Sequence, residues 1–289
     1  MTNQISTSNL LTFDIEGFIE SSYESMRVPA EYISERLEAE EIEANTASIL
    51  DLLEEFGQKA TFFVLGRIAR DMPHLVRRIA DAGHEIGCHS LFHRRLYNFQ
   101  RNEVAAFLEE AKSRLEDASG GPVYGFRAPD FSITRSNLWA FDLLREKSFL
   151  YDSSIYPTGL HDVYGISDFP TIPFRFPNGL IEVPLSTVRI FSRNIPYGGG
   201  GYFRLYPLAV TEALFRGSNR KGVAAVVYLH PYEVGNMVRK IRGIGIFKSF
   251  RTYVGQKKTA AKLRALLGAF SFARVIDYLG QKRIDEILV

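Results

Sequence analysis

Short apolar runs alternate with longer amphipathic segments along this chain of 289 residues. The apolar runs have the length and composition of buried strands, and they cover residues 10–13, 59–66, 84–90, 123–127, 149–153, 181–185 and 223–229. Apolar side chains recur at helical spacing between them, most clearly in residues 42–56, 75–80, 103–117, 134–147 and 207–216. Continuous apolar strands that alternate with helices are typical of a parallel sheet covered by helices.

The number of predicted strands favours a barrel over an open, doubly wound sheet. The glycine-rich fingerprint of a dinucleotide-binding fold does not follow the first strand, which removes the main reason to expect the open form. We therefore expect an α/β fold, a distorted (β/α) barrel of about seven parallel strands formed by residues 1–234. Residues 235–289 are basic, and we expect them to form a helical C-terminal extension packed on the barrel.

Composition places the chain among ordinary globular proteins. With 46% hydrophobic and 24% charged residues it can bury a sizeable core, and its apolar runs fall short of the roughly 18 residues of a membrane span. Residues 1–9 are polar and lack the pattern of a signal peptide. The single cysteine, Cys88, excludes an internal disulfide and fits a reducing compartment. These features predict a cytoplasmic protein.

Charge is unevenly distributed, although the net charge is only +2. Residues 1–60 carry 13 acidic side chains against three basic ones, whereas the chain after Pro231 carries 12 basic side chains against four acidic ones. This asymmetry indicates either a polyanionic or membrane-surface partner at one end, or simply solvated helix faces. We expect no nucleic-acid partner.

Polar side chains lie at or just beyond the ends of the predicted strands. They are Asp14, Glu16, His89, His93, Arg127, Asp152 and His230. In a βα barrel the active site forms at the C-terminal ends of the strands, so these side chains should converge. The i, i+4 spacing of His89 and His93 suits two metal ligands if the segment turns helical after its strand.

Each of these residues also has a structural explanation. The two acids near residue 15 could cap the following loop, and Arg127 could form a purely structural ion pair. Asp152 lies in an Asp-Ser-Ser sequence that suits turns, and His230 before a proline could be a buried core histidine. Strand alternation points Cys88 away from His89, which favours a buried cysteine without a role in the site.

Five stretches, taken in order, resemble the polysaccharide deacetylases of carbohydrate esterase family 4, which include chitin and peptidoglycan N-deacetylases. They are Thr12-Phe13-Asp14-Ile15-Glu16-Gly17, His89-Ser90-Leu91-Phe92-His93, Arg127-Ala128-Pro129, Asp152 and Leu229-His230. The resemblance spans about residues 8–234. The family's usual first motif is Thr-Phe-Asp-Asp-Gly, so here the second acid is displaced by one residue and is a glutamate.

The resemblance implies a role for each of these side chains. Asp14 would be the general base, and Glu16, His89 and His93 would hold a divalent metal ion, with zinc expected and cobalt, manganese or nickel as alternatives. An exchange of roles between the two acids stays open. Arg127 would orient the base, and His230 would protonate the departing amine with Asp152 as its partner.

Two further stretches are expected to contact the substrate. The first is Pro129, Asp130 and Phe131, where Asp130 replaces the family's usual aromatic residue. The second follows the glycine run at 198–201 and consists of Tyr202, Phe203 and Arg204. The run from Gly198 to Leu205 and the tail sequence Phe250-Arg251-Thr252-Tyr253 resemble an exopolysaccharide-associated bacterial subfamily.

The expected function is therefore a metal-dependent hydrolase that removes N-acetyl groups from amino sugars of a bacterial surface polysaccharide or its precursor and releases acetate. Two alternatives stay open: an amidohydrolase of the same fold that acts on a small non-sugar amide or imide, and a catalytically silent carbohydrate-binding protein. The partner would be an N-acetylated carbohydrate, with a lipid-linked form among the candidates. The oligomeric state stays open.

The basic tail suggests a contact with the inner membrane. Between residues 236 and 265, apolar side chains (Ile241, Ile244, Ile246, Phe247, Phe250) lie among basic ones (Arg239, Lys240, Arg242, Lys248, Arg251). This mixture suits an anionic membrane surface, and we consider that the segment docks the protein on the inner leaflet. The alternative is that the apolar side chains pack onto the barrel.

Overall fold

A computed structural model describes residues 7–26, 28–160, 165–243 and 245–282 of the chain. Its main sheet has the strand order β10-β1-β2-β3-β4-β5-β7-β6. The strands are β1 (Asn9–Ile15), β2 (Thr61–Val64), β3 (Glu85–Cys88), β4 (Gly125–Phe126), β5 (Tyr151–Asp152), β6 (Phe174–Arg175), β7 (Ile181–Glu182) and β10 (Val226–Leu229). All seven predicted strands are present, and they pair in parallel.

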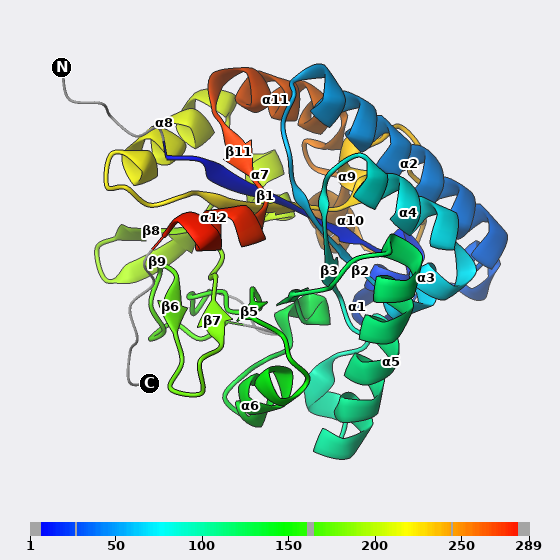
Figure 1. The fold of residues 1–289 in the computed structure, drawn as a ribbon. Coiled ribbons are helices and arrows are strands. Elements are labelled where there is room, and N and C mark those ends of the chain that lie inside the picture. Colours follow the sequence, from blue (N-terminus) through cyan, green and yellow to red (C-terminus); the bar gives the residue numbers. More distant parts are fainter. Residues whose placement is uncertain (1–6, 27, 161–164, 244, 283–289) are drawn as a thin grey trace.

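The sheet curls into a half-barrel with helices on its outer side (Figure 1). β10 and β6 are its two edges in the described part of the chain, and β6 is antiparallel to β7. The predicted distorted (β/α) barrel is thus confirmed. Because the strands are parallel, their C-terminal ends lie at one end of the half-barrel, where the predicted site residues should meet.

Helices connect most of the strands, and their bounds differ in places from those predicted. They are α1 (Phe18–Met26), α2 (Glu35–Glu55), α3 (Gly66–Asp71), α4 (Pro73–Asp81), α5 (Arg101–Ser119), α6 (Trp139–Glu146), α7 (Gly200–Leu205), α8 (Leu208–Asn219), α9 (Pro231–Val234), α10 (Ile246–Tyr253), α11 (Gln256–Ala269) and α12 (Val275–Gln281). Short 3₁₀ turns cover Ala30–Tyr32, Leu96–Asn98 and Pro129–Phe131. The helix α2 begins earlier than the apolar pattern indicates, because Ser34 caps its N-terminus through the N–H of Leu37.

The sheet separates two apolar clusters. Odd positions of β1 (Leu11, Phe13, Ile15) pack against the outer helices in the larger cluster. Leu10 points to the opposite, inner face with Phe63 and Tyr151. Successive side chains of a strand alternate between faces, so Asp14 and Glu16 both lie on the inner side of the half-barrel. An acid-x-acid sequence therefore places two carboxylates on one face.

Three parts of the sheet structure were not predicted. The strand β6 lies outside the predicted apolar runs, and the strands β8 (Thr187–Ile190) and β9 (Arg193–Pro196) form a separate hairpin. The strand β11 (Phe272–Ala273) lies in the C-terminal segment and pairs in parallel with the start of β1. The segment after residue 235 is thus not purely helical, since it contributes a strand to the main sheet.

Among the described residues, no helix has the length and apolar character needed to cross a membrane.

Candidate metal and catalytic site

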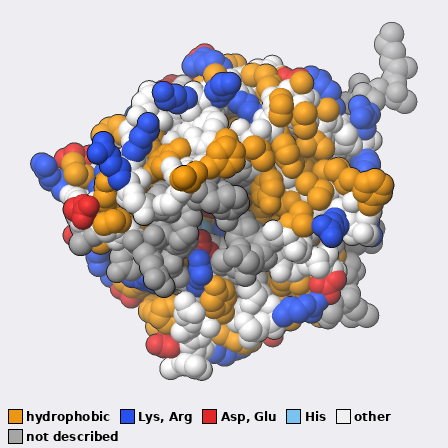
Figure 2. Space-filling model, turned by 180° about the vertical axis from the view of Figure 1, so that it is seen from behind, with side chains coloured by type: hydrophobic (Ala, Val, Ile, Leu, Met, Phe, Trp, Pro, Cys, Tyr) orange, Lys and Arg blue, Asp and Glu red, His pale blue; other side chains and the backbone are white. Residues whose placement is uncertain are grey.

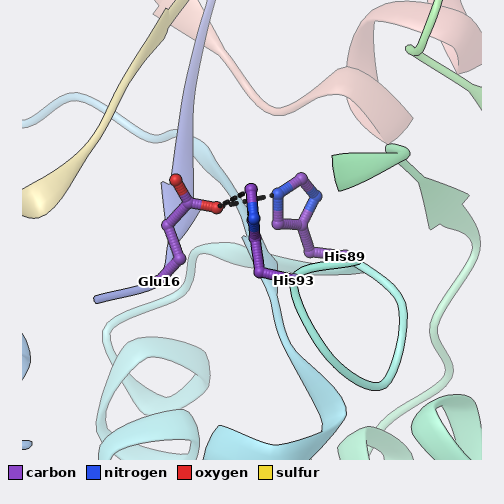
Figure 3. Close-up of side chains that lie close together, drawn as sticks. All are labelled: Glu16, His89 and His93. Atoms are coloured by element: carbon purple, nitrogen blue, oxygen red, sulfur yellow. Dashed lines mark hydrogen bonds and ion pairs between the residues drawn. The ribbon is translucent and has the colours of Figure 1, made fainter. Parts of the chain in front are cut away.

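Glu16, His89 and His93 converge at the C-terminal end of the half-barrel (Figure 3). Glu16 follows β1, and the two histidines follow β3. The Oε2 atom of Glu16 lies 3.1 Å from Nε2 of His89 and 2.9 Å from Nε2 of His93. All three side chains are buried, and their potential ligand atoms lie within 4.8 Å of one another. In the described parts of the chain this is the group whose donors could hold a metal ion.

The two histidines meet by a route that their spacing did not predict. We expected a helical turn, but residues 89–95 form no α-helix, and Ser90 adopts a left-handed conformation with φ of 69°. This conformation turns the chain sharply after β3. His89 Nδ1 lies 2.8 Å from the carbonyl oxygen of Arg127, which can only accept, so Nδ1 carries the hydrogen. The lone pair of His89 Nε2 therefore faces the centre.

The donor set fits a divalent metal ion. One carboxylate and two imidazoles are ligands that zinc and similar ions accept, with positions left for water and substrate. Burial would raise the pKa of the Glu16 carboxyl, but His93 and His230 hold it well below its usual value. Burial lowers the pKa of His93, but Glu16 raises it to about 9. The centre thus keeps a negative carboxylate that attracts cations, and a metal ion would compete with the imidazole protons.

Asp14 lies beside this centre and is held by Arg127. The guanidinium is fully buried, and its Nη1 donates to Asp14 Oδ1 at 2.8 Å and to Thr12 Oγ1 at 2.7 Å. The other nitrogens donate to the carbonyl and hydroxyl oxygens of Ser153. The ring of Phe63 lies 4.3 Å from the guanidinium carbon. Arg127 is therefore fixed on several sides, and it presents one N–H to the Asp14 carboxylate.

His230 lies on the other side of Glu16, and it is the most exposed side chain of the group at 17%. Its Nε2 is 3.3 Å from Glu16 Oε1, and its Nδ1 is 2.7 Å from Glu233 Oε2. The ring of Tyr232 stacks on the imidazole at a centroid distance of 4.9 Å. Burial would lower the pKa of His230, but Glu233 and Glu16 raise it to about 9. His230 is thus poised to carry a proton.

The partner of His230 is Glu233 and not Asp152, so that part of the expectation is wrong. Asp152 accepts hydrogen bonds from the N–H and hydroxyl of Ser154 and lies beside Glu182. Burial raises the pKa of Asp152, and burial together with Asp152 raises that of Glu182 well above its usual value. Of the two carboxyl groups, Glu182 is therefore the one that favours the protonated form. Asp152 shapes the turn whose Ser153 holds Arg127.

Sequence reasoning missed Glu233, although a signal was present. Glu233 is the third residue of the one-turn helix α9, and its carboxylate accepts the N–H of His230 at 3.0 Å. In a capping box, the residue just before a helix is followed three positions later by a glutamate, whose side chain accepts the backbone N–H of that first residue. In His230-Pro231-Tyr232-Glu233 this pattern could have indicated a carboxylate next to the histidine.

The first expected substrate-contact stretch lies next to the site but is mostly buried. Pro129 and Phe131 are buried, and the Phe131 ring packs at 4.8 Å from the ring of Tyr228. Asp130 has a φ of 51°, and its side chain forms an ion pair with Arg95 at 2.7 Å. Of the three residues, only Asp130 presents a partly exposed side chain, a quarter of whose surface is accessible.

The second stretch differs more from the expectation. Tyr202 is partly exposed, as a sugar contact requires. Phe203 is fully buried in the core, because its position on α7 faces the barrel and Lys262 Nζ lies over its ring. The side chain of Arg204 is 8% exposed, and its Nε is 2.9 Å from Glu233 Oε1. Phe203 and Arg204 therefore do not face a sugar.

Cys88 precedes His89 but takes no part in the site. Cys88 is buried in the outer cluster, and burial raises the pKa of its thiol to about 12. The thiol thus stays protonated and lies on the face of β3 opposite to the site.

Two family models match the chain. Residues 10–143 match a family described as polysaccharide deacetylase, and residues 153–280 match a domain of unknown function, DUF3473. The first match contains Asp14, Glu16, both histidines and Arg127, and the second contains His230 and Glu233. The main sheet draws strands from both matched regions.

Curated relatives are similar over part of the chain. A chitooligosaccharide deacetylase of Sinorhizobium fredii is 35% identical over 100 residues, which are 34% of this chain and 44% of that protein. A peptidoglycan-N-acetylglucosamine deacetylase of Bacillus cereus is 35% identical over 96 residues, which are 33% of this chain and 35% of that protein. The match thus spans less than half the length of these relatives.

Solved structures show the same fold over nearly the whole chain. A Mycobacterium smegmatis protein assigned to the polysaccharide deacetylases is 23% identical, with a TM-score of 0.62 over 99% of this chain and 95% of that one. The Puue allantoinase is 15% identical, with a TM-score of 0.64 over 96% of this chain and 90% of that one. Because these two structures carry different activities by name, the fold alone does not choose a substrate.

Proposed function

Because residues 10–143 belong to the polysaccharide deacetylase family, we propose that the protein is a metal-dependent hydrolase that removes N-acetyl groups from amino sugars of a bacterial surface polysaccharide or its precursor. The observation that carries this proposal is the arrangement of the site. The triad of Glu16, His89 and His93 is accompanied by the buried Asp14–Arg127 pair and by His230, whose Nε2 lies 3.3 Å from Glu16 Oε1.

This arrangement suits amide hydrolysis. A divalent ion held by the triad, for which zinc matches the donors, would polarise the acetyl carbonyl and the attacking water. Asp14, oriented by Arg127, accepts a proton from the water as the water oxygen adds to the carbonyl carbon. His230 then gives its proton to the nitrogen as the C–N bond breaks, so that acetate and a free amine leave. Glu233 holds the imidazole during this transfer.

The experiment is a hydrolysis panel with the metal content measured in parallel. We expect stoichiometric metal, with zinc ahead of cobalt, manganese and nickel, and chelator-sensitive acetate release from N-acetylated oligosaccharides or from lipid-linked or nucleotide-linked sugars. Turnover of a cyclic amide such as allantoin without acetate release would instead support the small-amide alternative, to which the fold of the Puue allantoinase lends support. Binding of sugars without bound metal or turnover would indicate a silent carbohydrate-binding protein.

The proposal that the substrate belongs to an exopolysaccharide rests on two sequence segments. The run from Gly198 to Leu205 and the tail at Phe250–Tyr253 resemble an exopolysaccharide-associated subfamily, and both lie within the region that matches DUF3473. We propose that the enzyme works on the cytoplasmic side, where a growing polysaccharide is carried on a membrane lipid. Among the panel substrates, a lipid-linked N-acetylated sugar should then give the highest kcat/KM.

Membrane docking by the basic tail completes this proposal. In α10, Ile246 is 91% exposed and Phe250 is 58% exposed, and Lys240 and Arg242 are exposed nearby in sequence. Figure 2 shows hydrophobic side chains at the surface with Lys and Arg beside them. Exposed apolar side chains next to basic ones favour an anionic lipid surface.

The docking set is smaller than the sequence suggested. Ile241 is buried in a cluster with Phe18 and Ile19, and Arg239 forms an ion pair with Glu41 at 2.7 Å. These two residues therefore belong to the packing of the tail on the barrel. Ile244 and the side chains of Phe247, Lys248 and Arg251 lie outside the described residues.

Vesicle co-sedimentation tests the docking. We expect binding to vesicles that contain anionic lipid, a loss of binding at high salt, and weaker binding of the Ile246→Ser/Phe250→Ser variant. Ile172→Ser is the matched control, because Ile172 is 50% exposed in a different part of the chain. Absence of binding to anionic vesicles at low salt would contradict the docking and leave the hydrolase proposal untouched.

A further inference from the structure

The carboxylate of Glu233 connects two groups that lie far apart in the sequence. Its Oε2 accepts hydrogen bonds from the backbone N–H and from Nδ1 of His230, at 3.0 and 2.7 Å. Its Oε1 lies 2.9 Å from Nε of Arg204. The side chain is 3% exposed, so neither contact is weakened by water. The position of Glu233 is therefore set from both sides.

Arg204 is itself held in place by the backbone. Its Nε also donates to the carbonyl oxygen of Gly200 at 3.2 Å, and its Nη1 donates to the carbonyl oxygen of Thr252. The helix α7 that carries it is anchored by Lys262, whose Nζ donates to the carbonyl oxygens of Phe203 and Tyr206. A guanidinium fixed in this way gives Glu233 one preferred orientation.

The glycines before Arg204 allow the chain to approach the site closely. A Cβ atom on Gly198 would lie 2.1 Å from the carbonyl oxygen of Val226, and one on Gly199 would lie 2.6 Å from the ring of Tyr228. A Cβ atom on Gly200 would lie 2.3 Å from Oε2 of Glu233, the oxygen that holds His230. A side chain at Gly198 or Gly199 would collide with the backbone or a buried ring, whereas one at Gly200 would push aside the end of the Glu233 side chain.

The fourth glycine of the run differs from the other three. A Cβ atom on Gly201 would meet only Nη2 of Arg204, at 4.0 Å, which is ordinary contact distance. The residue is also exposed. Gly200 and Gly201 are thus adjacent in the first turn of the same helix, but only Gly200 touches the carboxylate.

We infer that Gly200 and Arg204 are positioning residues that hold Glu233 against His230 and thereby aim the catalytic acid at the departing nitrogen. This inference rests on the proposed hydrolase function and deepens it. It assigns the glycine run to the proton-donating half of the site, where the sequence suggested a contact with the substrate. The base is held by Arg127, and His89 and His93 meet the Oε2 atom of Glu16, whereas His230 meets Oε1, so the base and the two histidines should be unaffected by changes in α7.

The test compares two substrates that differ in their need for an acid. Hydrolysis of an N-acetylglucosamine oligosaccharide expels an amine, which requires a proton, whereas hydrolysis of p-nitrophenyl acetate expels p-nitrophenolate, a stable anion that does not. We expect Gly200→Ala and Arg204→Gln to lower kcat on the oligosaccharide by about 10- to 100-fold with KM nearly unchanged. Metal content and turnover of p-nitrophenyl acetate should stay close to those of the wild type. Arg204→Lys should recover part of the loss, because it keeps a positive charge beside Glu233.

Gly201→Ala is the matched control and should behave like the wild type on both substrates. The Gly200→Ala variant should fold normally, because the atom that it displaces is the end of a flexible side chain. Equal losses on amide and ester, or equal behaviour of the two alanine variants, would overturn the positioning role while the hydrolase function stands. A wild-type protein that releases acetate from neither substrate would refute the hydrolase function and this inference together.

Discussion

The two ends of β3 offer a comparison within one strand. At its C-terminal end, His89 and His93 meet the carboxylate of Glu16. At its N-terminal end, His84 and Glu85 are also buried, with 6% and 7% of their surface exposed. At both ends of β3, histidine and glutamate side chains are therefore buried, but the groups that surround them differ.

The pKa values of the two glutamates move in opposite directions. Burial raises the pKa of Glu85, and hydrogen bonds from Thr61, Ile276 and Tyr151 offset this only in part. Burial acts on Glu16 in the same sense, but nearby imidazoles reverse the result and lower its pKa well below the usual value. A neutral donor stabilises a buried carboxylate less than a positive charge does, so only Glu16 is held firmly as an anion.

The histidines show the same contrast. Burial lowers the pKa of His84 to about 4, with Lys59 and Arg274 adding to the effect, whereas Glu16 raises the pKa of His93 to about 9. One end of the strand thus gathers opposite charges that can bind metal and move protons. At the other end, uncharged hydrogen-bond donors surround Glu85, and backbone hydrogen bonds to Glu85 and Thr61 tie the C-terminal segment to the sheet. This division matches βα barrels, where residues at the C-terminal strand ends act in catalysis and those at the N-terminal ends in stability.

The largest effect is expected from removing a metal ligand. His89→Ala and His93→Ala should each lose bound metal and all measurable hydrolysis while the protein stays folded, because two remaining ligands hold a divalent ion poorly. Metal analysis and circular dichroism measure the two properties. His74→Ala is the control, since that histidine is 62% exposed and pairs with Glu43 at the surface. Unchanged metal affinity in either ligand variant would show that the triad is assigned wrongly.

Loss of the base or acid should have the next largest effect. Asp14→Asn and His230→Ala should keep the metal and lower kcat by about 10² to 10⁴. His230→Ala should also remove the fall of the rate at alkaline pH, which arises when the acid loses its proton. Steady-state kinetics across pH measure both. Loss of metal in Asp14→Asn would mean that Asp14 and Glu16 exchange roles, and near-normal turnover in either variant would exclude its proposed role.

The sequence predicted well those features that depend on local pattern. The seven apolar runs became the parallel strands, because continuous burial leaves a clear signal. The acids, histidines and Arg127 could be placed together because parallel strands bring their ends to one edge. The short strands β6 and β11 have two residues each and no pattern of their own, so only their pairing with neighbours defines them.

Contacts between distant segments were harder to predict. Glu182 lies in β7 and meets Asp152 only because β5 and β7 pair. Arg204 precedes Glu233 by 29 residues, so nothing local in the sequence links the two. An arginine beside a glycine-rich segment is as compatible with a sugar contact as with a buried ion pair. The turn at Ser90 was missed because the i, i+4 spacing of two histidines fits a helix, and a left-handed serine has no sequence signal.

A substitution at the N-terminal end of β3 should change the stability of the protein and not its activity. The carboxylate of Glu85 accepts hydrogen bonds from Thr61 Oγ1 at 2.6 Å, Tyr151 Oη at 2.8 Å and the N–H of Ile276 at 3.1 Å. Glu85→Ala leaves these buried donors without an acceptor, and we expect the free energy of unfolding to fall by about 3 kcal/mol. Denaturant unfolding measures it.

Two observations complete this test. Glu109→Ala should leave the free energy of unfolding close to that of the wild type, because the pair of Glu109 with Lys147 lies at the surface. The kcat of folded Glu85→Ala should equal that of the wild type. A loss of turnover at full metal occupancy would show that the two ends of the strand are coupled, against the division proposed above.

The smallest expected effect is a dependence of stability on pH that originates at His84. Its Nδ1 accepts the N–H of Ala60 at 3.3 Å, and its pKa falls from 6.5 to about 4 on folding because the ring is buried beside Lys59 and Arg274. Between these two values the unfolded chain binds a proton that the folded chain does not. The contribution to stability is therefore complete above pH 6.5 and is lost as the pH falls toward 4, which amounts to about 2 kcal/mol between pH 7 and pH 5.

Replacement of His84 by a group that does not titrate should remove this contribution. His84→Gln retains an acceptor for the N–H of Ala60, and its free energy of unfolding should fall by about 2 kcal/mol less than that of the wild type between pH 7 and pH 5. Other titrating groups are common to both proteins, so the difference between the two curves isolates His84. His74→Gln makes the same chemical change at an exposed histidine and should leave the curve unchanged. If His84→Gln and the wild type lose stability in parallel, His84 is protonated in the folded protein, and the N-terminal end of β3 carries a charge like the other end.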